Sequence, residues 1–138
     1  MKKILTTIVL SGMIITAFAQ KTFKPIHYTM IISGANKNAA SGDIKVNMKD
    51  STIIIGEGPA KKFKIEMMAP EQNALSDDKS LTTWLSFLCN SSDSRSYTIM
   101  IARQQQPNGT KIMNVQVNCD GADPVVYDCD YLQEPYTD

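Results

Sequence analysis

Polar and apolar side chains alternate along most of this chain, and this alternation constrains the fold more than any other feature. In residues 43–48, Ile44, Val46 and Met48 occupy every second position, with polar side chains between them. A period of two places alternate side chains on opposite faces of a β-strand. The same pattern, together with runs rich in β-branched residues, predicts further strands at residues 27–32, 51–55, 62–67, 96–103, 113–119 and 125–131.

Turn-forming residues separate these segments, notably at 56–59, 107–109 and 120–124. The small, polar stretch 33–42 is expected to be a loop. About eight strands joined mostly by short turns predict an all-β fold, a small antiparallel meander. It should close as a barrel or fold into a two-sheet sandwich, because a single sheet would leave one apolar face in water.

One segment fits two structures. Leu81, Trp84, Leu85 and Leu88 have the spacing of a helical face, whereas Leu85, Phe87 and Cys89 alternate as in a strand. Threonines at 82 and 83 disfavour a helix. We therefore predict a strand at 82–89, with a short helix near 76–88 as the alternative.

The first 19 residues have the features of a signal peptide. Lys2 and Lys3 precede an apolar run, and Ala17-Phe18-Ala19 has the small-x-small pattern of a cleavage site. We expect residues 1–19 to be cleaved and residues 20–138 to form a single domain. The predicted location is the periplasm of a Gram-negative bacterium or the surrounding medium. No later stretch is apolar enough to cross a membrane as a helix.

The charge balance argues against a nucleic-acid partner. The chain has 14 basic and 14 acidic residues, and removal of residues 1–19 takes away two lysines and no acid. A nucleic-acid-binding domain needs a basic face, which this slightly acidic mature chain does not indicate.

Three cysteines, Cys89, Cys119 and Cys129, fall on predicted inward faces. Because exported proteins fold in an oxidising compartment, we expect a disulfide bond among them. The spacing leaves the pairing open. A catalytic thiol is the alternative, but it would need a base nearby.

Candidate catalytic and metal-ligating residues are sparse. The chain has one histidine, His27, and no Gly-x-Ser-x-Gly motif. A hydrolase would have to use His27 or a pair of carboxylates. Asn118, Asp120 and Asp123 resemble part of a calcium loop, but Cys129 stands where the loop needs a bidentate glutamate. We therefore predict no metal site and no cofactor.

Aromatic side chains are the candidate ligand contacts. Trp84, Tyr127 and Tyr131 are the residues that we expect to bind a ligand, although aromatic side chains also fill barrel cores. A barrel of about eight strands is either filled by its own side chains or holds one small ligand.

The signal-like start, the small size and the density of strands resemble small exported all-β proteins of Gram-negative bacteria, including those with lipocalin-like barrels. The Gly-x-Trp signature of true lipocalins is absent, since the only tryptophan, Trp84, follows Thr83.

The leading functional hypothesis is an exported, non-enzymatic binding module for a small apolar ligand, a glycan or an envelope protein. A secreted hydrolase is the first alternative. The second is a structural or inhibitor-type protein of the envelope, which would have a filled core and an apolar surface patch.

Overall fold

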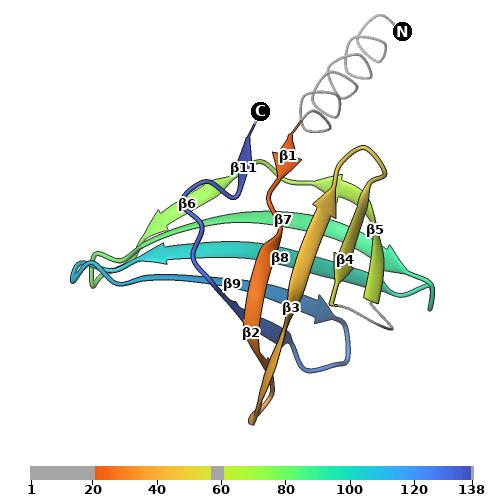
Figure 1. Cartoon of the computed structure of the whole chain (residues 1–138), viewed down its shortest axis with the longest axis horizontal. Helices are drawn as coiled ribbons and strands as arrows, with labels where there is room; N and C mark the ends of the chain where they lie inside the picture. The colour runs from red at the N-terminus through yellow and green to blue at the C-terminus, as the bar shows by residue number, and fades with distance from the viewer. Residues whose placement is uncertain (1–20, 57–60, 138) are drawn as a thin grey trace, which may run out of the picture.

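The computed structural model describes residues 21–56 and 61–137. These residues form strands and no helix (Figure 1). The strands are β1 (Thr22–Phe23), β2 (Ile26–Ser33), β3 (Asn36–Asn47), β4 (Thr52–Ile55), β5 (Lys61–Met68), β6 (Gln72–Leu75), β7 (Leu81–Ser91), β8 (Ser96–Gln105), β9 (Lys111–Cys119), β10 (Val125–Cys129) and β11 (Tyr136–Thr137). The predicted signal peptide, residues 1–19, lies outside the described residues. Within the described ranges, no helix is long and apolar enough to span a bilayer.

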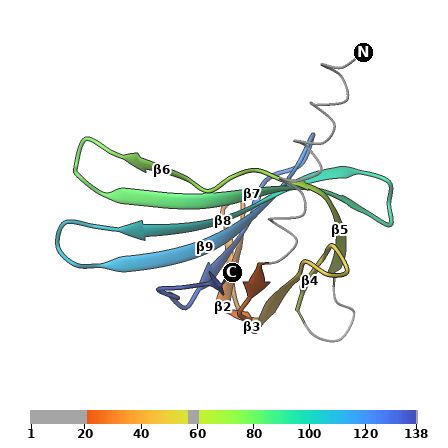
Figure 2. The same ribbon diagram turned by 90° about the horizontal axis from the view of Figure 1, so that it is seen from above.

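Eight of the strands close into an antiparallel barrel. They follow the order β5-β4-β3-β2-β10-β9-β8-β7, and β7 pairs with β5 to complete the ring. The extra strand β6 pairs with the first part of β7, and the β6–β7 and β8–β9 hairpins project away from the barrel (Figure 2). The predicted all-β meander is therefore confirmed, as a lipocalin-like barrel and not a sandwich. Closure removes the unpaired edges that an open sheet would expose.

The alternative of a short helix near residues 76–88 is wrong. Residues 81–91 form β7, which pairs with β8 from Leu81 to Asn90 and with β5 and β6 on its other side. Three partner strands satisfy its backbone groups, so tertiary pairing overrides the helical spacing of its leucines.

The loop predicted at residues 33–42 is also wrong. β2 and β3 form a hairpin with its turn at Gly34, whose φ of 59° suits glycine, and β3 already begins at Asn36. Small polar residues build this part of β3 because most of it is exposed. At Gly42 the absence of a side chain is essential, since a Cβ atom there would lie 2.5 Å from the hydroxyl of Tyr28.

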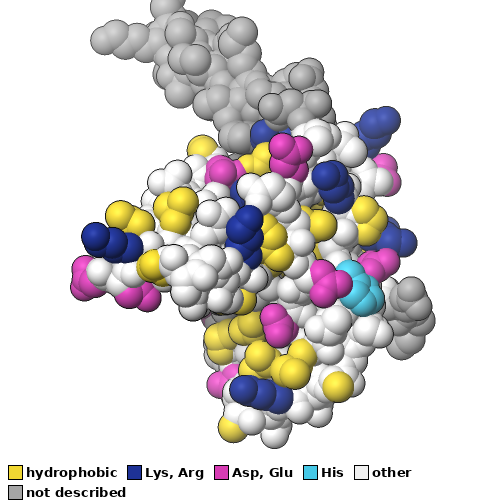
Figure 3. Space-filling model, turned by 60° about the vertical axis from the view of Figure 1, so that its left-hand side comes forward, with side chains coloured by type: hydrophobic (Ala, Val, Ile, Leu, Met, Phe, Trp, Pro, Cys, Tyr) yellow, Lys and Arg dark blue, Asp and Glu magenta, His cyan; other side chains and the backbone are white. Residues whose placement is uncertain are grey.

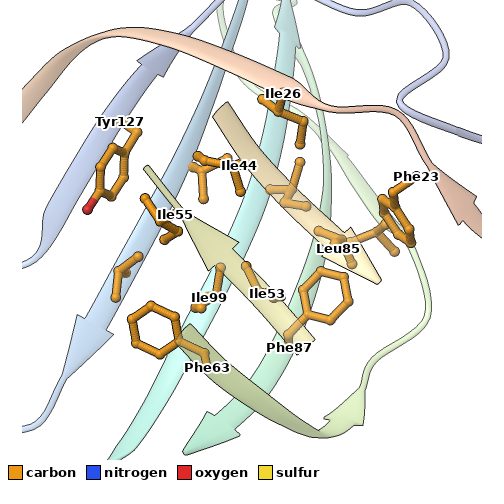
Figure 4. Packing of buried hydrophobic residues seen from close by; sticks show 14 of the residues in the cluster. Phe23, Ile26, Ile44, Ile53, Ile55, Phe63, Leu85, Phe87, Ile99 and Tyr127 are labelled. Carbon is orange, nitrogen blue, oxygen red and sulfur yellow. The ribbon is translucent and has the colours of Figure 1, made fainter. Parts of the chain in front are cut away.

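Inward side chains fill the body of the barrel. Ile26, Ile44, Ile53, Phe87 and Ile99 have no exposed surface, and they come from strands all around the ring (Figure 4). Burial of one such side chain contributes about 1.5–3 kcal/mol. No passage through the middle of the barrel is therefore open to a ligand.

The two terminal segments cover one end of the barrel, which we call the closed end. β1 pairs with β11, and Phe23 packs against Phe87 and Tyr136 with ring centroids 6.0 and 5.3 Å apart. The backbone N–H of Asp130 donates to the carbonyl oxygen of His27 at 2.9 Å, which ties the C-terminal segment to β2. The opposite end, which we call the open end, is bordered by the β2–β3, β7–β8 and β9–β10 turns.

Candidate ligand-binding hollow

A hollow of about 1070 Å³ lies at the open end of the barrel. Its inner wall is made of apolar and aromatic side chains from β5, β8, β9 and β10, namely Phe63, Tyr97, Val117, Val125 and Tyr127. Because the barrel body is filled, the hollow is a cup at one end and not a channel.

Strand register brings these residues to the same end. Val117 of β9 lies opposite Val125 of β10, and Tyr97 of β8 lies opposite Cys119, which also lines the hollow. Each residue stands on the inward face near the end of its strand, where the core below it stops. Phe63, Val117 and Tyr127 are buried there, whereas Tyr97 and Val125 are partly exposed.

Edge-to-face aromatic pairs hold two sides of the wall. The ring of Phe63 lies 5.1 Å from that of Tyr97, and the ring of Tyr127 lies 5.0 Å from that of Tyr28. Phe63 and Tyr127 are each only 3% exposed. Such pairs contribute about 0.5–1.5 kcal/mol beyond their burial, so this part of the wall is preformed.

Polar contacts fix the outer rim of the wall. The hydroxyl of Tyr97 donates to Oδ2 of Asp93 at 2.7 Å, and this hydrogen bond raises the pKa of Tyr97. The backbone N–H of Arg95 donates to the other carboxylate oxygen of Asp93 at 2.9 Å, and the two donors lower the pKa of Asp93. Deeper in the wall, burial raises the pKa of Tyr127.

The hollow continues over the rim onto the outer face of β3, β4 and β5. Basic side chains border it there, including Lys45, Lys62 and Lys64, with Ile54 between them. The site therefore combines an apolar inner wall with a basic outer border.

A second, smaller hollow of about 350 Å³ lies at the closed end. Arg103 and the C-terminal residues 133–137 line it, and the Arg103 guanidinium donates to the carbonyl oxygen of Gln133 at 2.6 Å. It has no aromatic wall comparable to that of the open end, since Tyr136 is its only aromatic lining residue among those described.

The structure separates the three residues expected to bind a ligand. Tyr127 lines the open hollow. Trp84 stands on the outer face of β7, opposite Ala102, because Leu85 and Phe87 occupy the inward face. Tyr131 lies near the closed end, where its hydroxyl accepts a hydrogen bond from Nε2 of Gln105 at 3.1 Å.

Sequence reasoning missed Phe63, Tyr97, Val117 and Val125 as wall residues. The alternating pattern placed them on inward faces, and each lies close to a predicted turn. What the pattern lacks is the order of the strands around the ring, which decides which strand ends meet.

The expected disulfide bond is absent, and Cys89, Cys119 and Cys129 are free. Tyr97 lies between Cys89 and Cys119 in the sheet, so these cysteines are two strand spacings apart, or about 10 Å. Cys129 pairs with Met113 at the other end of β9 from Cys119, about 20 Å along the strand. Both separations exceed the Cα–Cα distance that a disulfide bond can span, about 7 Å.

Two of these thiols sit in an apolar environment. Burial raises the pKa of Cys89 and of Cys129 to about 12. A thiol in this state is a poor nucleophile, because the thiolate is the reactive form. Their surroundings are those of core residues.

The histidine of the hydrolase hypothesis lies outside the open hollow, whereas the carboxylates of Asp50, Asp93 and Asp123 line it. His27 is on the outer face of β2, where its Nδ1 lies 3.0 Å from Oδ1 of Asp43. Neither residue lines either hollow. Figure 3 shows the histidine, in cyan, beside acidic side chains on the surface.

The segment that resembles a calcium loop forms the β9–β10 turn. Asp123 lines the open hollow, and its carboxylate lies next to Gly34 of the β2–β3 turn. Among residues 21–56 and 61–137, no three histidine, cysteine or acidic side chains come together as a metal site.

Comparisons with protein-family models, curated proteins and solved structures found no match for this chain.

Proposed function

We propose that this chain is an exported, non-enzymatic binding module that holds a small apolar ligand in the open end of its barrel. The observation that carries the proposal is the inner part of the hollow, with its wall of aromatic and aliphatic side chains; the whole hollow, basic outer border included, measures about 1070 Å³. Pockets for small molecules typically enclose about 300–1000 Å³ and are mostly apolar, with a few polar groups at fixed positions.

The wall suits an apolar ligand for a physical reason. Val125 and Tyr97 are only partly buried although they pack against the core, so the free protein leaves apolar surface in water. A ligand that covers this surface gains about 25 cal/mol per Å² of apolar area removed from water. Phe63 packs against Tyr97, and Tyr127 packs against Tyr28. Because these rings are already held in place, a ligand loses less free energy in ordering them when it binds.

Export is part of the same proposal. Residues 1–19 carry the signal-like pattern described above. Burial keeps the thiols of Cys89 and Cys129 protonated, and protonated thiols resist oxidation, so these two free cysteines are compatible with an oxidising compartment.

The test is binding of phenylnaphthylamine, a neutral fluorophore whose emission rises in apolar surroundings, to the protein purified from an exporting bacterial host. We expect saturable binding that is lost in Val125→Trp, because the larger side chain fills the hollow. Val126→Trp is the matched control, since Val126 is the next residue of β10 and does not line the hollow.

Retained binding in Val125→Trp, with an unchanged circular dichroism spectrum, would place the fluorophore elsewhere and contradict the proposal. Loss of binding in both variants would also count against it, because Val126 faces away from the hollow.

A further inference from the structure

Three lysines form a cluster on the outer face of β3 and β5. Lys45 lies opposite Ile54, and Ile54 lies opposite Lys62, so the two lysines flank one isoleucine across three strands. Lys64 lies two residues further along β5, on the same face as Lys62. Neighbouring strands are about 4.8 Å apart, so all three ammonium groups can reach one small anion above Ile54.

In the described part of the chain no carboxylate forms a salt bridge with this cluster within 4.0 Å; Glu66, two residues from Lys64 on the same face of β5, accepts a hydrogen bond from Asn90 instead. The ion pairs found there join His27 to Asp43 and Arg103 to Glu71, and none involves the three lysines. Lys45, Lys62 and Lys64 thus combine three positive charges without a salt-bridge partner within 4.0 Å.

The acids that line the same hollow are engaged or distant. Asp50 accepts a hydrogen bond from Nδ2 of Asn47 at 3.0 Å, and Asp93 accepts from Tyr97 and from the backbone of Arg95. Asp123 belongs to the β9–β10 turn, next to Gly34. Among the described lining residues of β3–β5 and the turns between them, the four lysines Lys45, Lys61, Lys62 and Lys64 outnumber the one carboxylate, Asp50, so this side of the hollow has a net positive charge.

Polar side chains complete the surroundings of the lysines. Thr52 lies opposite Lys64, and Asn90 lies opposite Lys64 on its other side, where its Nδ2 donates to Oε1 of Glu66. Thr52 and Asn90 line the hollow together with the lysines. Hydroxyl and ammonium groups are the donors that a carboxylate or phosphate oxygen accepts.

We propose that the ligand is an amphiphile with one anionic head group, a carboxylate or phosphate, held by Lys45, Lys62 and Lys64. This inference rests on the proposed function for the apolar half of the ligand. The head group lies on the basic border, and the apolar chain crosses the rim to the wall formed by Phe63, Tyr97 and Val125.

The experiment measures how dodecyl phosphate and dodecanol, both below their aggregation concentrations, displace phenylnaphthylamine. The two compounds share one apolar chain, so their ratio isolates the head group. We expect the phosphate to bind more tightly at low salt and the advantage to shrink as salt rises. Lys62→Gln/Lys64→Gln should weaken phosphate binding about 25-fold, or about fivefold per lysine, and leave dodecanol binding unchanged.

Lys37→Gln is the matched control, because Lys37 is an exposed β3 lysine that does not line the hollow. Equal displacement by dodecyl phosphate and dodecanol would overturn the inference while leaving the proposed function intact. Weakening of about fivefold by Lys37→Gln, the same factor per lysine as in the double variant, would overturn it as well, since binding would then depend on net charge alone.

Amide chemical shifts separate the remaining outcomes. Shifts at Lys45, Lys62 and Lys64 on addition of dodecyl phosphate support the head-group site, even if phenylnaphthylamine does not bind and the proposed function fails. Binding to vesicles of phosphatidylcholine with phosphatidylglycerol, without any response to dodecyl phosphate, would overturn it in favour of a membrane surface.

Discussion

The two ends of this barrel are built from the same strands but differ in what lies beyond the strands. At the closed end, the chain termini run across the opening, and Phe23 packs between Phe87 and Tyr136. At the open end the described residues beyond the strands form turns, and inward side chains such as Tyr97 and Val125 line a hollow. The two ends therefore differ because β1 and β11 cover only the closed end.

The largest expected difference is between the reactivity of the thiol at the open end and that of the other two thiols. Cys119 lines the open hollow, whereas Cys89 is fully buried and Cys129 lies toward the closed end. Because the pKa of Cys89 and of Cys129 is raised to about 12, their thiolate fraction at mildly alkaline pH is about a thousandfold below that of an ordinary thiol. We expect a thiol reagent to modify Cys119 first, as shown by mass spectrometry of the native protein.

The same pKa shifts predict a pH dependence of stability. The unfolded chain releases the protons of Cys89 and Cys129 near their ordinary pKa of 9.0, while the folded chain keeps them up to about 12. The free energy of unfolding should therefore fall as the pH rises from about 9 to 12. Cys89→Ser should reduce this slope, and an equal slope in that variant would contradict the assignment.

Truncation at the closed end should cost more stability than truncation at the open end. Phe23→Ala removes a buried ring that contacts two others, so we expect a loss of about 3 kcal/mol in urea unfolding. Tyr97→Ala removes a partly exposed ring and should cost less than half as much. A larger loss of stability in Tyr97→Ala than in Phe23→Ala would contradict this difference between the two ends.

Gly42 tests how closely the wall near the open end is packed. In Gly42→Ala the new Cβ atom would lie 2.5 Å from the hydroxyl of Tyr28, whose ring packs against Tyr127. We expect destabilisation of about 2 kcal/mol from overpacking. Ser41→Ala, at the preceding exposed position, is the control, and equal urea midpoints for the two variants would show that Tyr28 moves freely.

The smallest effect is expected at the rim of the hollow. Tyr97→Phe removes one of the two hydrogen bonds that lower the pKa of Asp93, and the bond from the Arg95 backbone remains. A carbon NMR titration should show the pKa of Asp93 rising part of the way to its ordinary value. Tyr131→Phe, which removes a hydroxyl near the closed end, should leave it unchanged.

Much of the fold could be predicted from the sequence because alternation is a local property. The strands around residues 43–48, 62–67 and 113–119 are confirmed, with the predicted faces inward except at Met67, which an irregularity between Ile65 and Met67 turns outward while Met68 is buried. The strand at 36–42 was missed because small polar residues carry no periodic signal. There the pairing with β2 supplies the strand conformation.

The site was harder to predict because it depends on pairing between distant strands. Tyr127 could be recognised as an inward aromatic residue, but nothing local brings it near Phe63. Trp84 lies in the segment whose pattern fitted both a helix and a strand. Because the segment is a strand, Trp84 faces outward. The disulfide prediction used the correct faces of the cysteines but lacked the register that separates them.

The most direct test of the central claim is a map of amide chemical-shift changes on addition of phenylnaphthylamine. We expect changes at Phe63, Val117 and Val125 in the open end, and none at Phe23 or Tyr136 in the closed end. Changes concentrated at the closed end, or on the outer face around Trp84, would contradict it.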